Sequence, residues 1–218
     1  MPSKIQIVGI YNSIDEIPYY QLKSSLIIST IQSKENTLNI CYISPLISDN
    51  DLKRVQDDVD TFINKKIKEE TYLLINQFVS PETFFVVDQA MNKTECIKYL
   101  VNKAMINKDV NSNFLQQVLH REKLSSTAFF GKFAIPHSNI QNANSNKLYI
   151  MVNKQGVKWD NQNIKIIILI LIKGNAMDEF RSLYTCLTET LYKNDSIFKN
   201  ISYINSVDDM LNYLFQQN

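Results

Sequence analysis

The sequence holds two histidines, His120 and His137, and the second follows a proline that orients the chain. Proline fixes its own φ angle and biases the residue before it toward an extended conformation, so Ile135-Pro136 predicts an extended approach to His137. The polar run Ser138 to Lys147 comes next, which predicts that His137 lies where a strand meets a loop, with an exposed ring. Imidazole titrates near neutral pH, and its neutral ring nitrogen can act as a nucleophile.

Arg121 is the candidate partner for a charged group on such a nucleophile. Its planar guanidinium can donate two parallel hydrogen bonds to phosphoryl oxygens. Taken by themselves, these residues leave a structural interpretation open. A single histidine beside a proline is more often a structural or surface group, and an Arg-Glu pair at a helix end is usually a solvated cap.

Composition limits the classes of function. A length of 218 residues predicts one or two domains, with the 44% hydrophobic content of a globular protein. A net charge of +1 disfavours binding to nucleic acid. Neither a membrane span nor a signal peptide is expected. Cys41, Cys96 and Cys186 are odd in number and far apart, which predicts reduced, buried thiols in a cytoplasmic protein. We expect no metal or other cofactor.

The first eighty residues predict part of an α/β unit. Ser48 is the expected N-cap of a helix, with Asp51 three residues later and apolar residues at helical spacing beyond it. Ser80-Pro81 is the predicted domain boundary, because proline stops a helix. Before the helix lie three short apolar runs that suit strands covered on both faces, at residues 5–10, 25–31 and 38–43.

Residues 82–218 predict a mixed sheet flanked by helices. Asn92 and Glu95 have capping-box spacing ahead of an amphipathic helix, and Ser206 is the expected cap of the last one. The run 164–172 is apolar enough to be a central strand. Other expected elements are a helix from 114 to about 121, a strand at 148–152 and a helical stripe over 180–191.

The string REKLSST from Arg121, then Gly131 and Ala134-Ile135-Pro136-His137, resembles the signature of the fructose/mannitol-type EIIA domain of the bacterial sugar phosphotransferase system (PTS). Gly156-Val157-Lys158-Trp159 and the apolar strand after it are also similar, so the resemblance covers nearly all of residues 82–218. It implies that His137 accepts a phosphoryl group and that Arg121 lies beside it. The donor would be the phosphocarrier HPr or an EIIB protein.

Two positions depart from the family pattern. Lys132 and Phe133 follow Gly131, where the family often has Gly-Asn-Gly. Phe180 aligns with a position where many members carry a second active-site histidine, and His120 lies in the arginine segment instead. These departures favour phosphorylation as a signal over efficient onward transfer to a transporter.

Residues 1–80 resemble the later half of an EIIB-like domain that lacks its first strand and phosphocysteine loop. Cys41 lies in a later apolar strand and is expected in the core. This order of domains is the C-terminal arrangement of BglG-type regulators and antiterminators, in which DNA- or RNA-binding modules come first. The resemblance implies a regulatory region of such a protein, reporting sugar supply, with no direct nucleic-acid or membrane contact of its own. Alternatives are an EIIA component that passes phosphate from HPr to EIIB, or an interaction module that is not phosphorylated. Homodimerisation is left open.

Overall fold

The computed structural model describes residues 5–32, 38–138, 142–174 and 176–215. Contacts divide the chain into two units, residues 1–70 and 71–218. The helix α2 (Asp49–Phe78) begins in the first unit and ends in the second.

The first unit contains a small parallel sheet and the first part of α2. Ser48 caps this helix as predicted, because its Oγ accepts a hydrogen bond from the backbone N–H of Asp51. The Asp51 carboxylate accepts in return from the N–H and the hydroxyl of Ser48. The other elements are η1 (Ile14–Glu16), α1 (Tyr19–Ser24), β1 (Ile27–Ser29) and β2 (Ile40–Tyr42), the two strands pairing in parallel.

Two predictions for this unit are wrong. Residues 5–10 form no strand, and Ile7 and Ile10 are 79% and 92% exposed. A β-rich run becomes a strand only where a neighbour pairs with its backbone, and among the described residues of this unit β1 pairs only with β2. The strands are also not covered on both faces, since Ile28 is half exposed. Cys41 is buried as expected, and desolvation together with nearby Asp58 raises the pKa of its thiol to about 11.

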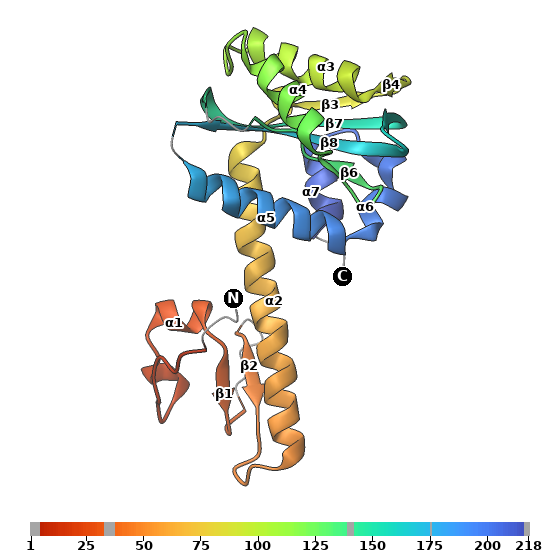
Figure 1. The fold of residues 1–218 in the computed structure, drawn as a ribbon. Coiled ribbons are helices and arrows are strands. Elements are labelled where there is room, and N and C mark those ends of the chain that lie inside the picture. Colours follow the sequence, from red (N-terminus) through yellow and green to blue (C-terminus); the bar gives the residue numbers. More distant parts are fainter. Residues whose placement is uncertain (1–4, 33–37, 139–141, 175, 216–218) are drawn as a thin grey trace. The chain divides into compact units, whose positions relative to one another are not determined.

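The second unit is built on a mixed six-stranded sheet with the order β3-β7-β8-β6-β5, to which β4 adds by pairing with β7 (Figure 1). The strand predicted to be central, β8, does lie between β7 and β6. The elements of this unit are η2 (Pro81–Thr83), β3 (Phe84–Val87), β4 (Met91–Asn92), α3 (Lys93–Ile106), α4 (Phe114–Leu124), β5 (Ala128–Phe129), β6 (Phe133–Ala134), β7 (Asn142–Trp159), β8 (Gln162–Lys173), α5 (Met177–Lys193), α6 (Asp195–Lys199), η3 (Ile201–Tyr203) and α7 (Val207–Phe215).

The predicted helix signals of this unit are confirmed. Asn92 and Glu95 form the capping box at the start of α3, each side chain accepting from the other's backbone N–H. Ser206 accepts a hydrogen bond from the N–H of Asp209 at the start of α7. The helix α4 runs one turn past the predicted end, to Leu124.

The strand β7 is much longer than predicted. The expected polar loop from 138 to 147 is shorter, because residues from 142 onward belong to β7, where Lys147 pairs with Leu171. Backbone pairing with an apolar partner strand has overridden the polar side chains. The rest of the expected loop, residues 139–141, lies outside the described residues.

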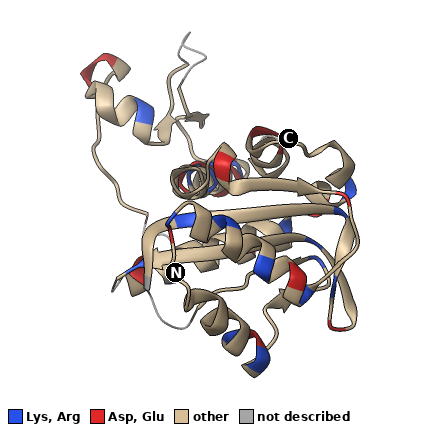
Figure 2. Cartoon of the chain, turned by 90° about the horizontal axis from the view of Figure 1, so that it is seen from above, with Lys and Arg blue, Asp and Glu red and all other residues tan. Residues whose placement is uncertain are grey.

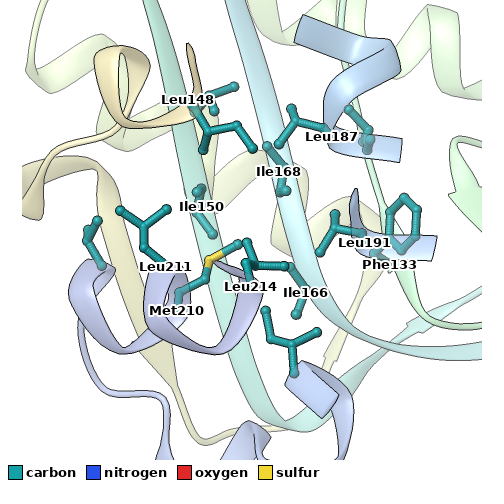
Figure 3. Packing of buried hydrophobic residues seen from close by; sticks show 14 of the residues in the cluster. Phe133, Leu148, Ile150, Ile166, Ile168, Leu187, Leu191, Met210, Leu211 and Leu214 are labelled. Atoms are coloured by element: carbon teal, nitrogen blue, oxygen red, sulfur yellow. The ribbon is translucent and has the colours of Figure 1, made fainter. Parts of the chain in front are cut away.

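Alternation along the two long strands fills both faces of the sheet. Leu148, Ile150, Ile166 and Ile168 point to the face covered by α5 and α7, as Figure 3 shows. The residues that alternate with these along β7 and β8, among them Tyr149 and Met151, face α3 and α4. Helices therefore cover both faces of the sheet.

The predicted boundary at Ser80-Pro81 follows the end of α2 and begins η2, where the Thr83 hydroxyl accepts from the N–H of Ser80. The division by contacts falls earlier, after Glu70. The boundary at Ser80-Pro81 stays a prediction.

Both acidic and basic side chains occur along the helices (Figure 2), and their numbers nearly balance, with a net charge of +1. In the ranges that the structure describes, no helix is long and apolar enough to cross a membrane.

Candidate functional site

The backbone around His137 is fixed by the sheet. The N–H of Ile135 donates to the carbonyl of Thr127 at 3.0 Å, and the N–H of Ile170 donates to the carbonyl of Pro136 at 3.3 Å. His137 itself forms an isolated parallel bridge with Ile170. The extended approach predicted from Ile135-Pro136 is therefore correct, and it places the imidazole at the end of β6, beside β8.

The Nδ1 atom of the His137 ring is engaged in a hydrogen bond. Nδ1 lies 2.9 Å from the carbonyl oxygen of Ile135, with which it forms a hydrogen bond. A carbonyl oxygen only accepts, so this contact assigns the ring proton of the neutral imidazole to Nδ1. The lone pair then resides on Nε2, which is the nucleophilic position.

The expectation of an exposed imidazole is wrong, since His137 is only 8% exposed. Two aromatic rings of α5 pack against it: the ring centroids of Phe180 and Tyr184 lie 5.3 and 5.5 Å from that of His137. We call this pair the aromatic cover. The run that follows His137 in sequence is polar, and the cover comes from a later helix that no local pattern indicates.

Burial lowers the pKa of His137 below its ordinary value of 6.5, and the hydrogen bond to Ile135 partly offsets this effect. The positive charge of Arg121 lowers this pKa further, while the negative charge of Glu122 raises it. The imidazole is therefore neutral at pH 7, the protonation state that a nucleophile requires.

Arg121 lies in the last turn of α4, and its guanidinium donates a hydrogen bond of 2.9 Å to the carbonyl of Ser125. Its charge also lowers the pKa of Tyr184, against the larger effect of burial that raises it. One guanidinium thus acts electrostatically on both His137 and a ring of the aromatic cover. The two predicted site residues, Arg121 and His137, therefore lie close enough for the charge of the first to lower the pKa of the second.

Glu122 is a site residue that the sequence analysis did not single out. Its carboxylate is 5% exposed and accepts hydrogen bonds from the hydroxyl of Thr127 at 2.6 Å and from the indole N–H of Trp159 at 2.8 Å. It also accepts from the N–H of Thr127, and Lys93 lies 4.0 Å away. Glu122 therefore ties the turn after Arg121 to β7. The sequence features that could have indicated this role of Glu122 are the Arg-Glu pair itself, the threonine of REKLSST and the later tryptophan.

The hairpin between β5 and β6 shows how the departure at Lys132 is accommodated. Phe130 and Gly131 have φ angles of 54° and 68°, and the N–H of Lys132 donates to the carbonyl of Phe129 at 2.9 Å. Two consecutive left-handed residues are typical of the tight turn that suits a twisted hairpin. Phe130 takes the strained position, and Lys132 forms an ion pair with Asp195 of α6.

His120 is exposed on α4, one residue before Arg121. It lines a shallow hollow next to the His137 segment. The hollow is lined by Asn113, Gln116, Gln117, Leu119, His120, Lys123 and Ser138. Among the described residues, no group of three or more His, Cys, Asp and Glu side chains could hold a metal ion.

Residues 77–217 match the family model described as the phosphoenolpyruvate-dependent sugar phosphotransferase system, EIIA 2. The chain belongs to this EIIA family. Among solved structures, the EIIA domain is similar to IIA mannitol from Escherichia coli, with 23% identity, a TM-score of 0.54, and coverage of 62% of this chain and 98% of that one. The nitrogen regulatory protein IIA-Ntr from Neisseria meningitidis is similar too, with 19% identity, a TM-score of 0.53, and coverage of 62% and 94%. These structures establish the EIIA fold.

Two curated relatives from Bacillus subtilis (strain 168) match across most of the chain. The "Probable licABCH operon regulator" is 22% identical over an alignment of 194 residues that covers 86% of this chain and 28% of the relative. The "Transcriptional regulator ManR" is 23% identical over 163 residues, which are 75% of this chain and 25% of the relative. The chain thus spans about a quarter of the length of these relatives, and in both the match extends beyond the EIIA domain alone.

Proposed function

We propose that this chain is the PTS-responsive region of a bacterial transcriptional regulator or antiterminator, reversibly phosphorylated on His137 to report sugar availability. The observation that carries the proposal is the state of the His137 ring. Its proton is committed to the carbonyl of Ile135, its Nε2 lone pair is free of that bond, and its pKa is held low by burial and by the charge of Arg121. The names of the two Bacillus relatives support the regulatory context.

The phosphoryl transfer would be a single displacement. Nε2 of the neutral ring attacks phosphorus, an Nε2–P bond forms, and the P–N bond of a phosphohistidine or the P–S bond of a phosphocysteine on the donor breaks. The donor's nitrogen or sulfur keeps the electron pair. The proton on Nδ1 stays in its bond to Ile135, and the Arg121 guanidinium stabilises the charged oxygens.

The donors are a phosphocarrier of the HPr type or an EIIB protein, and the site of action is the cytoplasm. A solved complex supports the second donor: that of E. coli enzyme IIA mannitol with phosphorylated enzyme IIB mannitol, which is similar to this chain with 22% identity, a TM-score of 0.54, and coverage of 64% of this chain and 98% of that one. Residues 1–80 would be the remaining part of an EIIB-like domain, and regulatory and nucleic-acid-binding domains would complete the protein. Phosphorylation adds a charge of about −1.5 to −2. Because the domain carries nearly balanced charges, this added negative charge would change its contacts with the neighbouring domains of the protein.

The similarity to IIA mannitol also favours a second function, in which the domain hands its phosphoryl group to an EIIB during sugar uptake. The aromatic cover argues against this alternative, because Phe180 puts an apolar ring against His137 where a polar group would assist release. Transfer of label from the phosphorylated chain to a purified EIIB would favour the uptake function.

The proposal is tested by incubating the chain with the upstream phosphocarrier proteins and radiolabelled phosphoenolpyruvate. We expect an acid-labile, base-stable label on the tryptic peptide Phe133–Lys147, which contains His137. The label should be lost in His137→Gln and kept in the matched control His120→Gln. No label on the wild-type chain, or equal labelling of His137→Gln, would rule out His137 as the acceptor.

A further inference from the structure

The ring that must react is almost fully buried. His137 is 8% exposed, and its Nδ1 is occupied by the carbonyl of Ile135. The aromatic cover contacts the same ring from α5. A reagent that approaches the ring from the side of α5 must therefore pass, or displace, part of this cover.

Contact between the aromatic cover and a phosphorylated His137 ring is unfavourable, because the phosphoryl group is charged and the two rings are apolar. A phosphoryl group brings about −1.5 to −2 charges and several strong acceptors. Placing such a group against two apolar rings costs free energy unless hydrogen-bond donors replace the lost water. The closed cover thus disfavours the modified state.

The two rings of the cover are held unequally. Phe180 lies in the first turn of α5, whose N-cap residue Ala176 makes no side-chain cap hydrogen bond. Tyr184 lies one turn further into the helix and also contacts the ring of Phe129, at 6.1 Å between centroids. Helix ends open more readily than helix interiors, so Phe180 is the part of the cover that moves first.

We infer that Phe180 controls access to Nε2 of His137, closing over the ring at rest and leaving it when a phosphoryl donor engages. Phe180 is then a residue that sets the reactivity of the acceptor without taking part in bond formation. The identity of the group transferred rests on the proposed function, but the control of access does not.

The experiment uses the whole chain and measures the accessibility of the two histidines side by side. Diethyl pyrocarbonate acylates accessible neutral imidazoles, and trypsin separates the two sites: Asp109–Arg121 carries His120, and Phe133–Lys147 carries His137. The ratio of the two rates, from peptide mass spectrometry, uses exposed His120 as an internal reference. We expect a low ratio in the wild type.

Phe180→Ala should raise this ratio about three- to tenfold, the range that corresponds to the loss of one aromatic contact. Tyr192→Ala is the matched control, because it removes an exposed ring from the same helix, and there the ratio should not change. Phe180→Trp, which keeps a ring in place, should keep the ratio low. Thermal unfolding by circular dichroism shows whether each variant is folded.

A second reagent tests the proposed chemistry. With phosphoramidate, Nε2 attacks phosphorus, the P–N bond of the reagent breaks, and ammonia leaves. ³¹P NMR and the same peptides then report phosphohistidine, which should form on His137 faster in Phe180→Ala. An unchanged ratio with both reagents in folded Phe180→Ala, or equal rates at both histidines in the wild type, overturns the inference. Faster acylation without any phosphohistidine from phosphoramidate or from the carrier proteins upholds control of access and overturns the proposed function.

Discussion

The ring centroids of His137 and Phe180 lie 5.3 Å apart, and this contact joins the end of β6 to the first turn of α5. The residue that would carry the phosphoryl group therefore touches a helix that also covers the main core. A charge added to His137 would therefore act on α5 through this contact and on α4 through Arg121 and Glu122. These two helices cover opposite faces of the sheet.

The first prediction concerns pH. The pKa of His137 in the folded chain lies below 6.5, so the unfolded chain binds more protons in this range. Stability should therefore decrease as the pH falls from about 6.5 through the folded pKa. Urea unfolding between pH 5 and 7.5 measures this slope. In His137→Gln the slope should be smaller, and an equal slope in both proteins would contradict the assignment.

Removing the carboxylate of Glu122 should destabilise the EIIA domain. Glu122→Ala leaves the N–H of Thr127 and the indole N–H of Trp159 without their acceptor, at a cost of about 3 kcal/mol, whereas Glu122→Gln keeps one acceptor oxygen and should cost less. Trp159 is the only tryptophan, so its fluorescence follows unfolding directly. The control Glu189→Ala breaks an exposed pair with Lys193 and should cost about 0.5 kcal/mol or less. Equal effects of Ala at 122 and at 189 would show that the buried carboxylate is not needed.

Two glycines with positive φ should differ in their tolerance of alanine. Gly131 has a φ of 68° and room for an added Cβ, so Gly131→Ala should cost only the left-handed strain of about 1 kcal/mol. Gly156 has a φ of 94°, and a Cβ there would collide with the side chain of Asn163. Gly156→Ala should thus be the more destabilising of the two by thermal unfolding. The reverse order would mean that Asn163 moves aside freely.

The thiols of Cys186 and Cys96 should react in an order set by burial. Cys186 is half-buried, whereas Cys96 is fully buried, and burial raises the pKa of both thiols. With iodoacetamide at pH 8, Cys186 should be alkylated first, and Cys96 only when the chain is unfolded in urea. Mass spectrometry of the labelled peptides gives the order. Rapid labelling of Cys96 in the native protein would indicate that the face of the sheet under α3 opens readily.

Local signals in the sequence predicted much of the EIIA domain. The capping box at Asn92, the cap at Ser206 and the central position of β8 depend on residues within a few positions of each other, and all three are confirmed. The strand expected at residues 5–10 failed because pairing depends on a partner that composition does not reveal. The cysteine prediction holds for Cys41 and Cys96, while Cys186 is only half-buried.

The residue types of the candidate site could be proposed from the sequence, but their environment could not. His137 and Arg121 stand out because they flank a short motif, whereas the burial of His137 comes from Phe180 and Tyr184 on a helix far along the chain. The role of Glu122 likewise needs Trp159, whose position follows from the pairing of β7 with β8. Contacts between distant segments are set by the packed fold, and local spacing in the sequence does not contain them.

The hydrogen bond from the His137 ring to the carbonyl of Ile135 has one more consequence. Its acceptor is a main-chain atom, and the flanking peptide groups are held by Thr127 and Ile170. The tautomer of the imidazole is therefore set by a backbone acceptor. Substitution of the Ile135 side chain would leave this acceptor in place. The side chains of this segment could therefore change without changing which ring nitrogen of His137 carries the proton.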